Sequence, residues 1–524
     1  MRSFFILFLT CFLSGSSVFA QTFSVDNPVL KKIWEEGNNN SKLQSLAQVL
    51  DDSLGSRLTG SPSLKSAQDW AVSKYGGWGV NAKIENYGEW KGWKRGVTHI
   101  DLLEPRVRTL EGTMLAWSAA TKAPVIATTI ILPDLADSAA YIQWLPKTKG
   151  KFVMVSPMQS TCRPDTNWKG FGTPESFDKM QKERTANEDN WRKRISKTGM
   201  TTDKIFLQLE MSGALGIINC LWTKGWGVNR IFGVSNEKIP VVTLNCEDYG
   251  LLYRLTENDQ HPKLSIETQS TYLGEVPVGN VIAEIKGKQK PDEYVMLSAH
   301  FDSWDGASGA TDNGTGTIVM MEAMRILKAV YPNPKRTILA GHWSGEEQGL
   351  NGSRAFVEDH PLILKGMQAV FNQDNGTGRV ERIGTQGLME AGAFIARMLE
   401  KLPTEISKNI SIIFSSMPSG GGSDNASFIC KGVPAFGLSS LNWDYFSYTW
   451  HTNRDTYDKL VFDDLRNNAV LVAMLVYLAC EEPELLSRER RTVFPMNQQT
   501  GKPVTWPDCV PAKRKFQINP PSVQ

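Results

Sequence analysis

The sequence predicts an α/β fold, with a mixed, mainly parallel sheet sandwiched by helices and a β-rich insert. Three observations support this prediction. Apolar strands and helical segments alternate after Thr268, which is typical of a parallel sheet covered on both faces. The stretch 115–268 instead has short β-runs divided by turns. The length of 524 residues exceeds what one hydrophobic core supports, so two or more domains are expected.

The first residues predict an export signal. Met1-Arg2-Ser3 precedes an apolar run over 4–13, and Val18-Phe19-Ala20 is a small-residue cleavage site. We therefore expect residues 1–20 to be a signal peptide and the protein to be exported, to the periplasm or outside the cell. A lipid anchor at Cys11 is the alternative, but the residues before it match that signal poorly. No apolar run is long enough for a transmembrane segment.

Charge and cysteine content narrow the classes of partner. The 57 basic and 55 acidic residues nearly cancel, so no global field favours nucleic acid or an anionic membrane. Six cysteines remain after the signal, an even number that permits disulfides in an oxidising compartment, although spacing does not reveal the pairing. Cys220 and Cys246 lie in apolar runs and are expected to be buried small side chains rather than ligands.

Residues 21–114 are expected to form the N-terminal part of the catalytic domain. Apolar residues recur at helical spacing over 28–75, with a break at 55–62, and two helices are expected there. The stretch 80–105 then takes strand-like patterns. Within the predicted insert, the charged stretch 163–204 is expected to be an exposed helical excursion.

Residues 269–487 are expected to be the catalytic domain proper. The predicted strands are 294–299, 337–343 and 367–372, and the predicted helices are 318–330, 353–357 and 391–402. The tail 488–524 is rich in proline and basic residues with little periodicity, so it is expected to wrap the surface or fray.

Metal-binding side chains follow the predicted strands, where sites form in sheets of this type. His300 is a candidate zinc ligand. Asp302 has the spacing that places it on the same side of an extended strand end, so its carboxylate is expected to orient the imidazole. Asp312 is expected to bridge two zinc ions, since one carboxylate can span both. Alternatively, Asp312 is only a helix cap.

Three further positions complete the candidate site. Glu346 and Glu347 are adjacent, which suggests a division of labour in which one binds metal and the other moves protons. Asp374 ends another apolar strand and is the remaining carboxylate candidate, or else a turn-forming aspartate. His451 follows an aromatic loop in a polar context, which favours a ligand over a buried structural histidine.

Motifs longer than the bare ligands carry a family resemblance. They are His300-Phe301-Asp302-Ser303-Trp304-Asp305, Pro334-Lys335-Arg336-Thr337, Glu346-Glu347-Gln348-Gly349 and Asp455-Thr456. They resemble the co-catalytic zinc exopeptidases, a family that includes carboxypeptidase Q and bacterial aminopeptidases. The resemblance covers most of the chain to about Leu486, and the insert is similar to the family's protease-associated domain.

The resemblance implies roles for individual residues. His300, Asp312 and Asp374 would hold one zinc ion, Asp312, Glu347 and His451 the other, and Glu346 would be the general base. The loop 420–424, with Ser423 and Asp424, looks like the family's substrate-facing loop. Some relatives place a tyrosine before the last histidine to stabilise the oxyanion, whereas this chain has Trp450 there. Tyr448 or Tyr445 is expected to replace it.

The leading hypothesis is an exported exopeptidase, an aminopeptidase or dipeptidase, that cleaves small peptides with two zinc ions. A glutaminyl cyclase-like enzyme is an alternative with the same ligands, although the large insert fits peptidases better. A catalytically inactive receptor or binding relative is the alternative of another class, but such proteins usually lose ligands and none is missing here. Peptide substrates and no nucleic-acid partner are expected, and a homodimer is left open.

Overall fold

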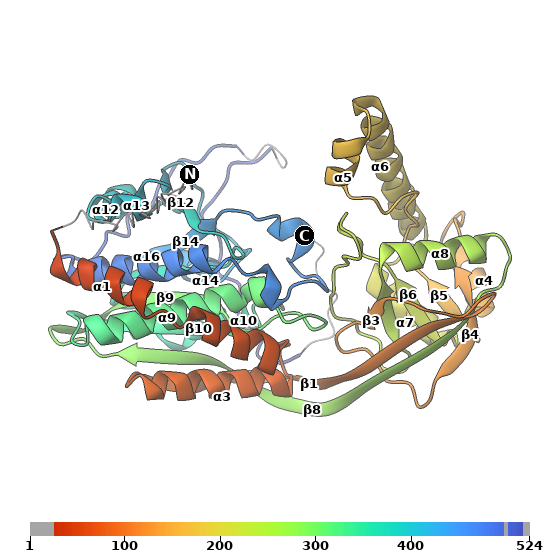
Figure 1. Ribbon diagram of the computed structural model, residues 1–524, viewed down its shortest axis with the longest axis horizontal. Helices are drawn as coiled ribbons and strands as arrows, with labels where there is room; N and C mark the ends of the chain where they lie inside the picture. Colours follow the sequence, from red (N-terminus) through yellow and green to blue (C-terminus); the bar gives the residue numbers. More distant parts are fainter. Residues whose placement is uncertain (1–25, 497–500, 517–524) are drawn as a thin grey trace, which may run out of the picture.

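The computed structural model describes residues 26–496 and 501–516. It has two lobes (Figure 1). We define the second lobe as residues 93–273 and the main lobe as the rest of the described chain. Two long antiparallel strands, β1 (Asn81–Glu104) and β8 (Lys263–Ile285), run through both lobes. The domain limits expected near 115 and 268 stay predictions. The signal-peptide prediction for 1–20 lies outside the described residues.

The main lobe is built on a mixed, mostly parallel sheet, as predicted. Its order is β13-β12-β14-β11-β9-β10-β8. The strands β14, β11, β9 and β10 are parallel. Strand β8 is antiparallel to β10, and β12 is antiparallel to β14 but parallel to β13. The strand bounds are β9 (Lys290–His300), β10 (Arg336–Trp343), β11 (Met367–Asn372), β12 (Val380–Gly384), β13 (Ser411–Ile413) and β14 (Ala435–Ser440).

Helices cover both faces of this sheet, because alternate strand residues point to opposite sides. Val295 and Leu297 join the larger core, and Met296 between them joins the smaller one. The larger core is covered by α1 (Pro28–Asn39), α2 (Leu43–Ala47), α3 (Pro62–Gly77), α9 (Thr315–Val330), α12 (Ala391–Leu399), α13 (Thr404–Ser407) and α16 (Phe462–Glu481). The smaller is covered by α10 (Asn351–Asp359), α11 (Pro361–Lys365) and α14 (Asn425–Ile429).

The second lobe continues the same sheet beyond β8. Strands β4 (Val125–Ile131), β5 (Phe152–Met154), β6 (Gly216–Asn219) and β7 (Val241–Leu244) are parallel, and β3 (Gly112–Met114) closes the edge. The short β2 (Arg108–Thr109) pairs with β1. Its helices are α4 (Ser138–Trp144), α5 (Asp165–Phe171), α6 (Pro174–Lys197), α7 (Thr202–Met211) and α8 (Cys246–Glu257). Helices α5 and α6 project from the lobe (Figure 1), so the charged stretch is helical as predicted.

Two disulfides link Cys162 to Cys246 and Cys430 to Cys509, while Cys220 and Cys480 are buried and free. The expectation for Cys220 is confirmed, but Cys246 is a disulfide partner because α8 begins opposite the segment that carries Cys162. Disulfides are typical of an exported protein in an oxidising compartment. Across the described ranges, none of the helices combines the length and apolarity needed to cross a bilayer.

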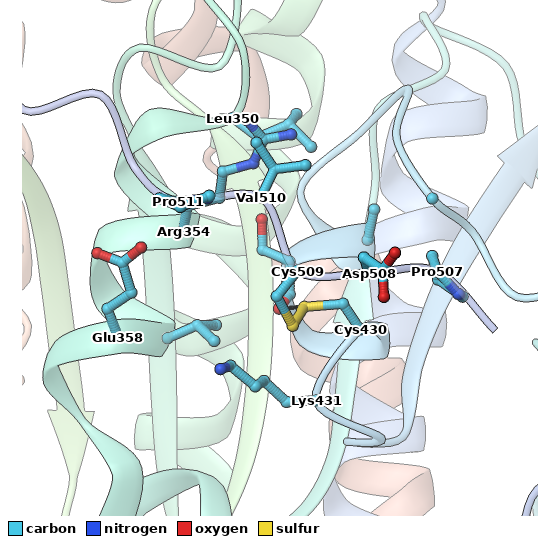
Figure 2. A pocket seen from close by; sticks show the side chains of 14 residues that line it. Leu350, Arg354, Glu358, Cys430, Lys431, Pro507, Asp508, Cys509, Val510 and Pro511 are labelled. Carbon is cyan, nitrogen blue, oxygen red and sulfur yellow. Dashed lines mark hydrogen bonds between the residues drawn. A yellow bond between two sulfur atoms is a disulfide. The ribbon is translucent and has the colours of Figure 1, made fainter.

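The C-terminal tail lies on the main lobe where the structure describes it, as predicted for a surface segment. Trp506 donates to the carbonyl of Ile429 at 3.0 Å, and the carbonyl of Arg514 accepts from the amide of Glu89 at 2.8 Å. The Cys430–Cys509 disulfide fastens the tail beside a cavity of about 130 Å³ that Arg354 and Lys431 also line (Figure 2).

Candidate metal centre

Three adjacent parallel strands bring the predicted site residues together. His300 is the last residue of β9, Asp374 follows the end of β11, and Glu346 and Glu347 lie just past the end of β10. Since β10, β9 and β11 are neighbours with the same direction, their carboxyl ends meet at one edge of the sheet. The site therefore lies where parallel sheets place their functional residues.

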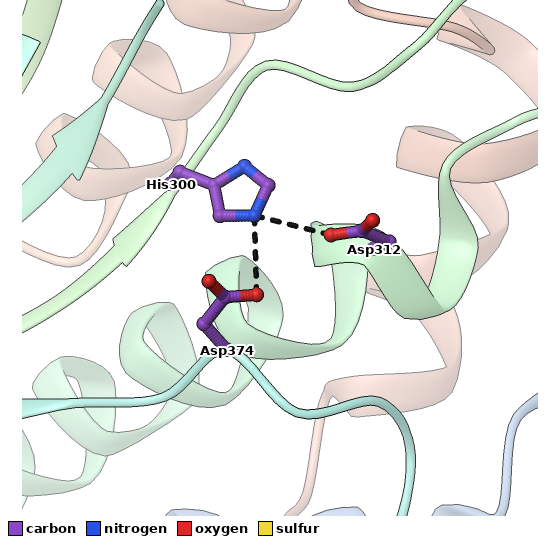
Figure 3. Close-up of side chains that lie close together, drawn as sticks. All are labelled: His300, Asp312 and Asp374. Carbon is purple, nitrogen blue, oxygen red and sulfur yellow. Dashed lines mark hydrogen bonds and ion pairs between the residues drawn. The ribbon is translucent and has the colours of Figure 1, made fainter. Parts of the chain in front are cut away.

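The first metal group consists of His300, Asp312 and Asp374 (Figure 3). The Nε2 atom of His300 lies 3.2 Å from Oδ1 of Asp312 and 3.3 Å from Oδ1 of Asp374. The His300 side chain is 1% exposed, and its Nδ1 lies 3.0 Å from the backbone carbonyl oxygen of Asp302. This contact leaves Nε2 free to act as a ligand atom.

The second metal group consists of Asp312, Glu347 and His451. The Nε2 atom of His451 lies 3.1 Å from Oδ2 of Asp312 and 2.9 Å from Oε2 of Glu347. The two carboxylate oxygens of Asp312 thus face different histidines, Oδ1 toward His300 and Oδ2 toward His451. This is the geometry required of a bridging carboxylate.

The electrostatics of the two groups fit bound cations. Oε1 of Glu347 is buried without a hydrogen-bond partner among the described residues, which is costly unless a cation is present. Burial raises the pKa of Glu347 to about 7, against the opposing charge of His451. Burial would also raise the pKa of Asp312, but the His451 and His300 imidazoles hold it well below its usual range. Imidazole and carboxylate groups are ligands that zinc takes.

Glu346 belongs to neither metal group, although it is the neighbour of Glu347. Burial raises its pKa well above the ordinary range, and the nearby Asp374 and Asp424 add to the shift while His300 opposes it. A carboxyl group with a raised pKa beside a metal centre suits proton transfer. Glu347 thus lies among the candidate metal ligands and Glu346 outside them, and the role of Glu346 as general base stays a prediction.

Asp302 acts on the site differently from the prediction. Its carboxylate is 3.8 Å from Nδ1 of His300, too far for a hydrogen bond, and its backbone carbonyl orients the ring instead. The carboxylate accepts the backbone amides of Glu346 at 3.2 Å and Glu347 at 3.3 Å, and the hydroxyl of Thr59 at 3.1 Å. The Asp302 carboxylate does not reach the His300 ring because the chain turns after His300 and directs the Asp302 side chain toward the two glutamates.

Two positioning residues were not assigned from the sequence. The Asp455 carboxylate accepts the backbone amides of Thr311 at 2.8 Å and of Asp312 at 3.0 Å, which fixes the bridging ligand. The Asp455-Thr456 motif was the signal for it. Buried Arg57 donates to the carbonyls of Phe301, Ser308 and Gly309 at 2.7–2.8 Å, and no sequence signal pointed to this residue.

Residues 280–476, which hold every ligand of both groups, match the model of peptidase family M28. The chain is similar to carboxypeptidase Q of Mus musculus, with 24% identity and coverage of 93% of this chain and 100% of the relative. A glutamate carboxypeptidase 2 homolog of Caenorhabditis elegans is 32% identical over 37% of this chain and 28% of its own length.

Two solved structures resemble this chain in fold. The peptidase M28 precursor from Shewanella amazonensis has a TM-score of 0.64 and 24% identity, covering 88% of this chain and 97% of its own. A zinc aminopeptidase from Bacillus subtilis has a TM-score of 0.54 and 20% identity, covering 86% and 96%. These two likenesses concern the fold, whereas the match to a peptidase family, the similarity to carboxypeptidase Q and the complete ligand set support a zinc-dependent peptidase.

The loop 420–424 borders the metal centre. Ser423 accepts from the Asn372 amide at 2.8 Å and lines a cavity of about 380 Å³ that also contains Asp374. Asp424 is fully buried, and burial raises its pKa to about 7. Asp424 lies outside that cavity lining, so of the two predicted substrate residues it is Ser423 that faces the open space.

The two tyrosines proposed for the oxyanion face different ways. The Tyr448 ring packs against Gly225 of the second lobe, where an added Cβ would lie 2.8 Å from its Cε1. Tyr445 is buried, and burial together with the nearby Asp312 and Asp374 raises its pKa well above the usual range. The identity of the oxyanion donor stays a prediction.

His451 is held by both lobes. Its backbone carbonyl accepts the amide of Ile231 at 2.7 Å, and its ring stacks on Trp450 at 3.9 Å and meets Phe232 edge-on at 5.4 Å. The next turn is tied as well, since Asn453 and Asn229 exchange hydrogen bonds of 2.9 and 3.0 Å. The second lobe is thus part of the support of one metal ligand.

Proposed function

We propose that the protein is an exported exopeptidase that hydrolyses small peptides with two zinc ions, as an aminopeptidase or dipeptidase. The observation that carries the proposal is Asp312, whose two oxygens face His300 and His451 at 3.2 and 3.1 Å. A site for a single metal ion would need only one of these two oxygens to face a histidine. The match of residues 280–476 to a peptidase family supports peptides as the substrate class.

Residues of this chain divide the work of hydrolysis. When bound, the two zinc ions supply Lewis acidity, which lowers the pKa of water and polarises the scissile carbonyl. Glu346 is placed to accept the proton of the attacking water and to pass it to the leaving amine. Asp302 keeps Glu346 and Glu347 in place through their backbone amides, and Asp455 does the same for Asp312.

The charge around the site favours a free N-terminus. Asp302, Glu346 and Asp424 lie beside the ligands, and these carboxyl groups suit a substrate ammonium group better than a carboxylate. Peptides with free, acetylated and C-terminally amidated ends, incubated with and without a chelator, test this proposal. We expect acetylation and the chelator to abolish cleavage, and amidation to have less effect. The reverse order of the two end modifications would contradict aminopeptidase action.

The reaction product distinguishes a peptidase from a glutaminyl cyclase. A peptide with N-terminal glutamine gives two fragments under a peptidase and a pyroglutamyl peptide of unchanged chain length under a cyclase. We expect fragments, which mass spectrometry of the reaction mixture distinguishes from a loss of ammonia. Binding of peptides without either product would indicate the inactive relative instead.

A further inference from the structure

An open cavity of about 380 Å³ lies beside the metal centre, and its lining is polar. It reaches Asp374, a ligand of the first metal group, and it is large enough for an amino-acid side chain. Amide and hydroxyl groups supply most of its polar surface, among them Asn375, Gln386, Ser416 and Ser423. A substrate bound at the metals would therefore have a neighbouring group in this cavity.

Arg382 is the cation of this cavity. The only other charged residue in the lining is Asp374. Its carboxylate is a candidate ligand in the first metal group. Arg382 lies on β12 and is exposed. Its guanidinium has neither a hydrogen bond nor an ion pair with any residue in the described part of the chain. The nearest charged neighbour in sequence, Glu381, pairs instead with Arg379 at 3.6 Å.

Some groups near the opening are already engaged with the protein. Gln386 accepts the backbone amide of Ser419 through its side-chain carbonyl at 2.9 Å, and the backbone amide of Gln386 donates to the Ser416 hydroxyl at 2.8 Å. Asn372 donates to Ser423. These bonds fix the shape of the cavity, whereas the five N–H donors of Arg382 have no acceptor in the described protein.

We propose that Arg382 binds a carboxylate of the peptide substrate in this cavity, so that the enzyme prefers peptides with a carboxylate beside the scissile bond. A guanidinium pairs with a carboxylate through two parallel hydrogen bonds. The carboxylate belongs either to an acidic side chain or to the C-terminus of a dipeptide. This inference rests on the proposed peptidase function and names its substrate class.

Isosteric substrate pairs test it. Glu-Ala against Gln-Ala and Ala-Glu against Ala-Gln report a side-chain carboxylate, and Ala-Ala against Ala-Ala-amide reports the C-terminal one. The quantity measured is the ratio of kcat/KM within each pair, for the wild type, Arg382→Gln and Arg379→Gln. Arg379 is a matched control because it lies three residues away, is paired with Glu381 and Asp464, and does not line the cavity.

We expect the wild type to favour the carboxylate member of at least one pair, and Arg382→Gln to lower that ratio on the order of 10- to 100-fold. Arg379→Gln should keep the wild-type ratio. A preference that survives in Arg382→Gln, equal loss on both members of every pair, or no preference in the wild type would overturn the inference. Absence of cleavage of all six dipeptides by the zinc-loaded wild type would instead contradict the proposed function. Zinc content and melting temperature confirm that each variant is folded.

Discussion

The two metal groups share Asp312 but differ in what holds their other ligands. His300 and Asp374 come from the ends of β9 and β11, two neighbouring strands in the middle of the main sheet. His451 lies on a loop whose backbone is hydrogen-bonded to Ile231 of the second lobe. The first group thus depends on one core, whereas the second depends on the contact between two lobes.

This difference predicts unequal metal affinity. Strand ends are held by the sheet ladder on both sides, so their geometry changes only if the core does. The His451 loop is positioned by a few hydrogen bonds and by packing on Trp450 and Phe232. Residues that orient ligands commonly change metal affinity 10- to 100-fold. We therefore expect the second zinc ion to be the first one lost.

The largest expected effect is that of Glu346→Gln, which should leave both metal groups intact. The variant should keep two zinc ions per chain and lose activity by roughly 10²- to 10⁴-fold, because only the proton acceptor is removed. Kinetics and elemental analysis of the same preparation check it. Glu347→Ala is the contrasting variant, expected to lose the second zinc ion. If the two variants behave in the opposite way, the pair has been assigned in the wrong order.

Asp312→Ala should weaken zinc binding at both metal groups. Because both groups use this carboxylate, zinc content should fall at both positions, and activity should fall with it. Elemental analysis of protein purified without added metal measures the change. Retention of two zinc ions by this variant would exclude the bridging role.

Asn453→Ala should affect the second group alone. The substitution removes the Asn453 side-chain bond to the Asn229 amide, and we expect an increase on the order of 10-fold in the dissociation constant of one zinc ion. Chelator titration followed by zinc release should show one ion leaving earlier and the other unchanged. Asn442→Ala is the control, since that exposed side chain makes no hydrogen bond with a described residue. Equal weakening of both ions would contradict the comparison.

The smallest expected effect is that of Thr59→Val. Thr59 donates to Asp302, and the loss of this buried hydrogen bond should cost about 0.5–1.5 kcal/mol. A few-fold fall in kcat/KM is expected because Asp302 keeps its bonds to the Glu346 and Glu347 amides. Thr109→Val removes a similar bond, to Asp101, on the surface, and should leave kcat/KM unchanged.

The sequence predicted the parts of the site that local pattern controls. Apolar runs that end in His300, Glu346 and Asp374 place these residues at one sheet edge once the strands are parallel. The support of His451 by Ile231 was not predictable in this way, because it joins segments 220 residues apart that only the packed lobes bring together. The same limit applies to the Cys162–Cys246 and Cys430–Cys509 pairs.

The role of Asp302 shows a second kind of limit. Its spacing from His300 suits an extended strand, but β9 ends at His300. Beyond that point the side-chain direction follows a loop held by Arg57, whose partners are backbone carbonyls and leave no trace in a sequence pattern. The strands β1 and β8 are likewise longer than the strands predicted from the sequence, because these two strands pair with each other across both lobes.

The stem formed by β1 and β8 makes the second lobe a removable module. Gly92 and Gly274 are direct partners on the two antiparallel strands, so a tight turn of about two residues could join them there. A chain closed in this way would keep the main sheet and all five metal ligands, but would expose Trp304 and leave the His451 carbonyl without its partner Ile231. For protein engineering, this stem is a graft point at which another lobe could be exchanged to alter access to an unchanged catalytic sheet.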